Sequence, residues 1–120
     1  MAAIRDVLNK FKAVNGVDMA AVVNIDGMQI DSFVRGNMDV DSVCAIATTG
    51  LQMSEALGRE TERGESLQTV LEYKGGAIVL EPLSDEAMML VVSADPNSIG
   101  RIRYMSKKYR QELIDALNGE

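Results

Sequence analysis

The chain lacks several residues on which small active sites usually depend. It has no histidine and no tryptophan, and Cys44 is its single cysteine. Without histidine there is no imidazole for general acid–base chemistry or for metal binding. A lone cysteine cannot form an intramolecular disulfide, which favours a reducing compartment. We therefore expect the protein in the cytoplasm.

Long apolar runs are also missing. No uninterrupted apolar stretch of about 18 residues occurs, so we expect no membrane insertion. Residues 1–14 form an amphipathic pattern with charges inside it, unlike the apolar core of a signal peptide. The net charge of −6 argues against a nucleic-acid partner. The aromatic content of 4% argues against a platform for base stacking.

Catalytic signatures are absent as well. The sequence contains no Gly-rich phosphate loop and no CxxC, HExxH or GxSxG motif. Asp39 and Asp41 are interpreted as helix caps, and the acidic residues near position 62 as a solvated loop. Cys44 is interpreted as a small buried residue, because no histidine can pair with it. The sequence therefore predicts no enzyme, no cofactor and no metal site.

The most informative stretch that is present is AMMLVVSA, residues 87–94. It is apolar at nearly every position, a pattern typical of a strand that is covered on both faces. Asp95 and Pro96 follow directly and suit the N-cap and first position of a helix, which we expect to continue to about Leu117. A sheet covered on both faces requires helices above and below it.

The other elements can be placed around this strand. Asp26-Gly27 predicts a two-residue hairpin turn that pairs Ile25 with Met28 and Val23 with Ile30. Apolar spacing and turn residues give the remaining elements: helices over residues 3–14 and from Asp39 or Asp41 to Arg59, an alternating edge strand over 67–74, and a short strand over 77–81. The predicted fold is one α+β domain over residues 1–120. It has three α/β/α layers, a five-stranded, mainly antiparallel sheet and the order α-β-β-α-β-β-β-α.

The second predicted helix is rich in small residues. One of its faces holds Val43, Ile46, Ala47, Gly50, Ser54 and Leu57. Glycine inside a helix costs about 1 kcal/mol relative to alanine. Two explanations for Gly50 stay open at this point: tight packing of the helix on its own sheet, or a helix–helix contact between subunits.

Charge is distributed unevenly along the chain. Residues 96–120 have a net charge of +2, whereas residues 1–95 have −8. The last predicted helix therefore has a basic face: Arg101, Arg103, Lys107, Lys108 and Arg110. A solvated helix surface, a docking strip for an acidic partner and a membrane-facing surface are three interpretations of it.

The whole pattern resembles the Roadblock family of dynein-light-chain-like domains, in particular its prokaryotic members. The resemblance rests on the element order, the VVNIDG hairpin at 22–27, the small-residue second helix and the apolar last strand that runs into Asp-Pro. It implies a five-stranded antiparallel sheet with one helix on one face and two on the other. It also implies a dimer whose second helices lie side by side and whose third strands pair. On this sequence these are residues 41–59 and 66–74.

The resemblance supplies candidate sites and partners. The expected homodimer interface is Cys44, Ala47, Thr48, Leu51, Gln52, Glu55, Leu67, Thr69, Leu71 and Tyr73. Family members commonly bind small Ras-like GTPases, and the candidate contacts to such a partner are Arg59, Arg63, Arg101 and Lys108. No residue is transferred as catalytic, because the family pattern has no reliably placed arginine finger.

These features predict a non-enzymatic homodimeric regulator or scaffold of a Ras-like GTPase in polarity, motility or signalling. The alternative is a structural adaptor dimer, like a light chain, for a larger assembly. An enzyme or small-ligand sensor on the same fold is a third class, which a deep polar pocket would favour.

Overall fold

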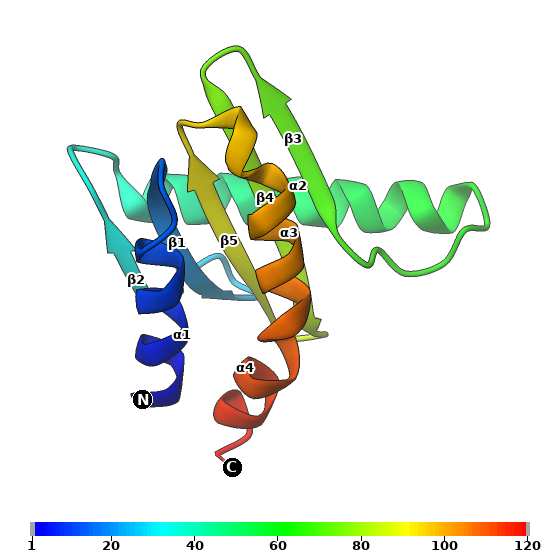
Figure 1. Cartoon of the computed structure of the whole chain (residues 1–120). Coiled ribbons are helices and arrows are strands. Elements are labelled where there is room, and N and C mark those ends of the chain that lie inside the picture. The colour runs from blue at the N-terminus through cyan, green and yellow to red at the C-terminus, as the bar shows by residue number, and fades with distance from the viewer. Residues whose placement is uncertain (1, 120) are drawn as a thin grey trace.

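The computed structural model describes residues 2–119, which form a five-stranded antiparallel sheet with helices on both faces (Figure 1). The elements follow in the order α1 (Ala2–Lys12), β1 (Val17–Asn24), β2 (Gln29–Val34), α2 (Val40–Glu60), β3 (Thr69–Tyr73), β4 (Gly76–Ser84), β5 (Ala87–Ser93), the 3-10 turn η1 (Pro96–Ser98), α3 (Ile99–Lys108) and α4 (Arg110–Leu117). This confirms the predicted fold class and element order.

The apolar strand β5 lies at the centre of the sheet. The strand order is β2-β1-β5-β4-β3, and β5 pairs with both β1 and β4. Met89, Leu90 and Val91 are at most 1% exposed, because helices cover both sides of the strand. The interpretation of residues 87–94 as a doubly covered strand is thus confirmed.

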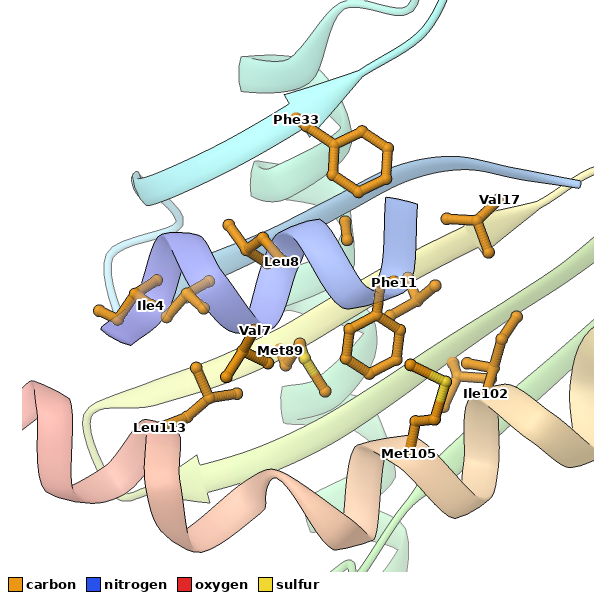
Figure 2. Close-up of a cluster of buried hydrophobic side chains, with 14 of the residues drawn as sticks. Ile4, Val7, Leu8, Phe11, Val17, Phe33, Met89, Ile102, Met105 and Leu113 are labelled. Carbon is orange, nitrogen blue, oxygen red and sulfur yellow. The ribbon is translucent and has the colours of Figure 1, made fainter. Parts of the chain in front are cut away.

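One face of the sheet is covered by α1, α3 and α4 together. Ile4, Val7, Leu8 and Phe11 form the apolar stripe of α1, and each is fully buried. Figure 2 shows these side chains in one cluster with residues of β5, α3 and α4. Burying a side chain of this size is worth about 1.5–3 kcal/mol. The stripe therefore attaches α1 firmly to the sheet.

The opposite face has α2 alone. Asp39 is its N-cap, since its Oδ1 accepts a hydrogen bond from the Ser42 backbone N–H over 3.2 Å. Hydrogen bonds from the backbone and hydroxyl of Ser42 lower the pKa of the Asp39 carboxyl. Cys44 and Leu51 point from α2 into the second apolar cluster, beside Leu90. One helix must shield this whole face.

The first hairpin differs from its prediction. Val22 pairs with Asp31 as expected, but a bulge follows and Val23 pairs with Gln29 instead of Ile30. The cause is Asn24, whose Oδ1 accepts hydrogen bonds from the backbone N–H groups of Asp26 and Met28, each over 3.0 Å. This side-chain turn lengthens the loop beyond two residues.

Further boundaries differ: α1 ends at Lys12 where residue 14 was expected, and β3 spans Thr69–Tyr73 within the expected 67–74. β4 continues through Pro82 to Ser84, whereas this strand was expected to end at residue 81. Proline is tolerated there because β3 does not pair with that part of β4, so no partner needs its missing N–H. The last helix is divided at Tyr109 into α3 and α4. Neither proline nor glycine stands at this break.

Candidate interaction surfaces

An apolar stripe runs along one exposed flank of α2. Ile46, Met53 and Leu57 are 71%, 69% and 65% exposed. Their spacing of seven and then four residues puts them on one side of the helix, and Gly50 lies between them. Large apolar side chains in such a row usually mark a contact with another chain. This stripe was not singled out as an interface from the sequence, although its helical spacing could have revealed it.

Gly50 has open space around it. A Cβ atom built on Gly50 meets no heavy atom within 4 Å. The chain's own sheet therefore does not require glycine at this position. Of the two explanations given above, packing of α2 on its own sheet does not account for Gly50.

The strand β3 forms one edge of the sheet, and α2 crosses it. β3 pairs only with β4, so its other edge has no partner strand among residues 2–119. Thr69 Oγ1 lies 3.1 Å from Ser54 Oγ of α2. Since side chains alternate along a strand, Leu71 and Tyr73 face the same way as Thr69. They are 38% and 56% exposed.

The shape of the molecule connects these two features. In Figure 1 the C-terminal part of α2 runs past β3, beyond the edge of its own sheet. Leu57 lies in this overhanging part, and Leu71 and Tyr73 lie on the β3 surface that α2 leaves uncovered. One chain thus has both an overhanging apolar helix and an uncovered apolar strand.

The predicted interface residues lie in three different places in the structure. Cys44 is fully buried and has no surface to offer a partner, and Ala47 is half-buried against the sheet. Thr69, Leu71 and Tyr73 lie on the α2 side of β3, where Thr69 contacts Ser54 and the other two side chains are exposed. The rest line a groove along the other flank of α2: Thr48, Leu51, Gln52, Glu55 and Leu67.

This groove has a volume of about 820 Å³ and separates α2 and residues 64–67 from the β4–β5 hairpin. It exists because β3 pairs with residues 76–80 only, whereas β4 extends to Ser84. The chain before β3 follows α2 instead, since the Ser66 backbone N–H donates to Glu55 Oε2 over 3.2 Å. Among residues 2–119, no strand pairs with this edge of β4 at residues 81–84.

A buried carboxylate lies at the end of the groove. Glu81 is 1% exposed, and its Oε1 accepts a hydrogen bond from Gln68 Nε2 over 2.7 Å. Arg110 Nε lies 3.6 Å from Glu81 Oε2 and donates to the Pro82 carbonyl over 3.0 Å. Gln68 Oε1 in turn accepts from Arg103 Nε over 2.7 Å. These contacts attach the start of β3 and the end of β4 to α3 and α4.

The four arginine and lysine candidates for partner contacts do not come together. Arg59 and Arg63 are exposed at the end of α2 and in the loop that follows it. Arg101 and Lys108 are exposed on α3, on the opposite side of the sheet. They therefore belong to two separate surfaces.

Few groups are arranged for chemistry. Within residues 2–119, no three His, Cys, Asp or Glu side chains are placed to hold a metal ion. Burial, with a smaller effect from the charge of Asp41, raises the pKa of the Cys44 thiol to about 11. The thiol is therefore protonated near neutral pH, as expected for a buried small residue. None of the helices in that range is long and apolar enough to cross a membrane.

Comparison with known proteins gives a consistent result. The family model described as the Roadblock/LC7 domain matches residues 3–93. Among curated proteins, the uncharacterized protein MJ1340 of Methanocaldococcus jannaschii is 25% identical over 107 residues, covering 89% of this chain and 93% of the relative. A second protein of that organism, MJ0310, is 26% identical over the same length and shares.

Solved structures share the fold. The gliding protein MglB of Thermus thermophilus superposes with a TM-score of 0.89 at 11% identity, over 99% of this chain and 91% of that chain. Myxococcus xanthus MglB gives a TM-score of 0.87 at 17% identity, over 98% and 96%. A Roadblock/LC7 domain from Streptomyces avermitilis gives 0.72 at 17% identity, over 90% and 95%.

Proposed function

The chain belongs to the Roadblock/LC7 domain family, and we propose that it acts in the cytoplasm as a non-enzymatic homodimeric regulator or scaffold of a small Ras-like GTPase. What supports the GTPase as partner is the family resemblance, because Roadblock-type domains commonly bind such proteins. What supports the homodimer is the pair of complementary apolar surfaces on one chain. Regulation of polarity, motility or signalling is the expected context.

The observation that carries the homodimer is the uncovered part of the sheet beside α2. Leu71 and Tyr73 face outward on the side where α2 runs past β3. A two-fold axis at the free edge of β3 would pair the two β3 strands. It would also lay each overhanging helix over the uncovered strand of the other copy. Such pairing removes an exposed strand edge, which is otherwise a site of uncontrolled association.

This arrangement revises the expected interface. We propose that Ile46, Gly50, Met53 and Leu57 of α2 contact the second copy, together with Thr69, Leu71 and Tyr73 of β3. Thr48, Gln52, Glu55 and Leu67 line the groove on the other flank of α2 and stay outside this interface. Cys44 is buried in the core and is also outside the proposed interface.

A GTPase assay tests the regulatory role. Ras-like GTPases from the same source would be loaded with GTP, and single-turnover hydrolysis and nucleotide exchange would be measured with and without this protein. We expect one of the two rates to change with a saturable dependence on its concentration. Rates that stay constant for every GTPase, with no complex on gel filtration, would contradict the proposal.

The groove favours the adaptor role as a second candidate. Its exposed apolar side chains could bind a segment of a larger protein. Leu67 is 75% exposed and Ile25 is 55% exposed, and both line the groove. A captured partner that slows amide exchange at residues 64–67 of this chain, and that contains no GTPase domain, would support the adaptor role over the regulator.

A further inference from the structure

The exposed surface of α3 consists almost entirely of cations. Its exposed residues are Gly100, Arg101, Arg103, Tyr104, Lys107 and Lys108, so every exposed side chain on this helix is basic or tyrosine. Within residues 2–119, none of the four cations lies within salt-bridge distance of a carboxylate. We call Arg101, Arg103, Tyr104, Lys107 and Lys108 the α3 strip.

Charge is separated across the molecule. α1, α3 and α4 have eight basic and three acidic side chains, a net charge of +5. The remaining residues have four basic and fifteen acidic side chains, a net charge of −11. Although the overall charge is −6, the three helices on the face opposite α2 in Figure 1 are positively charged. A charge distribution of this kind orients a protein in an electric field.

Helix stability does not explain the strip. Lys107 and Lys108 lie in the last turn of α3, where the helix dipole favours positive charge. Arg101, however, lies in the first turn, where the dipole favours negative charge, and this turn has no acidic residue. Folding alone would favour an acid at this end of the helix.

Tyr104 is the exposed large apolar residue of α3, at 64% exposure. Lys108 Nζ lies 5.8 Å from the centre of its ring. Lys107 borders the groove beside α2, but the other strip residues are not among those that line it, and Tyr104 is the single large apolar side chain of the strip. Stable protein interfaces require a packed apolar centre. A layer of anionic headgroups requires only positive charge, and tyrosine favours the interface between water and lipid.

We propose that the α3 strip docks this protein reversibly onto an anionic lipid surface, with α3 parallel to the headgroups and Tyr104 between them. The acidic side with α2 then faces away from the lipid. Docking needs only one chain, so it does not depend on the proposed function. If two copies do join at β3, both strips lie on the same side of the joined sheet and act together.

Vesicle binding tests this proposal directly. The full chain would be sedimented with phosphatidylcholine vesicles, with and without phosphatidylglycerol, at low and high salt. We expect binding only to vesicles that contain phosphatidylglycerol, and its loss at high salt, because exposed charges are screened. A basic residue near such a surface is worth about fivefold in partitioning. The double variant Arg101→Glu/Lys108→Glu should therefore lose roughly 25-fold or more.

The matched control is Arg59→Glu/Arg63→Glu, which changes the net charge equally on the other side of the molecule. It should bind the vesicles like the parent. Equal loss in both double variants would overturn the proposal, since only net charge would then matter. Circular dichroism of both variants would verify that they are folded.

A spectroscopic probe adds an independent readout. The chain has no tryptophan, so Tyr104→Trp creates a single reporter on the strip. Its emission should shift to the blue with phosphatidylglycerol vesicles and stay constant with phosphatidylcholine alone. No binding at low salt, or binding of an acidic polypeptide such as polyglutamate without any binding to vesicles, would overturn the lipid assignment.

Discussion

Gln68 donates a hydrogen bond from Nε2 to Glu81 Oε1 over 2.7 Å, across the point where β3 separates from β4. Because Glu81 is 1% exposed, its carboxylate depends on Gln68 and Arg110 in place of water. This bond positions the start of β3, and hence the strand edge at which we propose the dimer forms.

Removing Arg110 should destabilise the fold. Arg110→Ala takes away the cation beside a buried carboxylate and the donor to the Pro82 carbonyl. We expect the free energy of unfolding to fall by about 1–3 kcal/mol, the usual cost of an unsatisfied buried group. The effect should stay below that of a fully buried pair, because the Arg110 side chain is 43% exposed. Urea denaturation measures this change.

A double-mutant cycle separates the ion pair from other effects of Arg110. Once Glu81→Gln has removed the buried charge, Arg110→Ala should cost less than it does alone. Effects that add within about 0.5 kcal/mol would show that the two residues are independent.

A charge on the uncovered face of β3 should prevent dimer formation. Leu71→Glu puts a carboxylate where we propose the overhanging helix of the second copy, and burying it without a partner is costly. We expect the dimer to dissociate at least about tenfold more readily in sedimentation velocity runs. Gln52→Glu adds the same charge on the groove flank and should leave the dimer intact. Equal effects of both changes would contradict the revised interface.

The Cys44 thiol should not react with thiol reagents in the native protein. Burial holds it protonated, so Ellman's reagent should react at neutral pH only after unfolding. Its pKa is raised from an ordinary value of 9.0 to about 11 in the folded chain. Between these values the unfolded chain releases a proton that the folded chain keeps, so stability falls as the pH rises from 9 to 11. This alkaline loss should be smaller in Cys44→Ala, as urea titrations at several pH values can measure.

The fold could be predicted because apolar periodicity and turn residues agreed with each other. The unbroken run of β5 and the stripe of Ile4, Val7, Leu8 and Phe11 each dictated one kind of element. The details that failed depended on partners far from the local sequence. Asn24 lengthened the hairpin loop through its side chain. Pro82 remained in a strand only because its neighbour strand turned away.

The interaction surfaces were harder to predict for a related reason. Periodicity placed Ile46 and Leu57 on the same face as Val43 and Ala47. It could not show that the sheet covers only part of that face. That boundary depends on where α2 crosses β3, which is a property of the tertiary structure.

Gly50 offers the sharpest test of the dimer, because helix propensity and the interface predict opposite results. Within one chain nothing approaches its Cβ position, so Gly50→Ala should stabilise α2 by about 1 kcal/mol. If the helix of a second copy lies against Gly50, the added methyl group should instead weaken the dimer. We therefore expect Gly50→Ala to raise the unfolding free energy in the Leu71→Glu background and to raise the dimer dissociation constant in the parent.

The control for that experiment is Gly100→Ala in α3, where a Cβ atom also meets nothing within 4 Å. This position lies outside the proposed interface, so the change should stabilise the helix in both backgrounds without affecting dissociation. Both substitutions add the same methyl group to an open helical position, so weaker dimerisation in Gly50→Ala alone would point to the second copy. A Gly50→Ala dimer as tight as the parent would mean that glycine is not retained there for a close helix–helix contact.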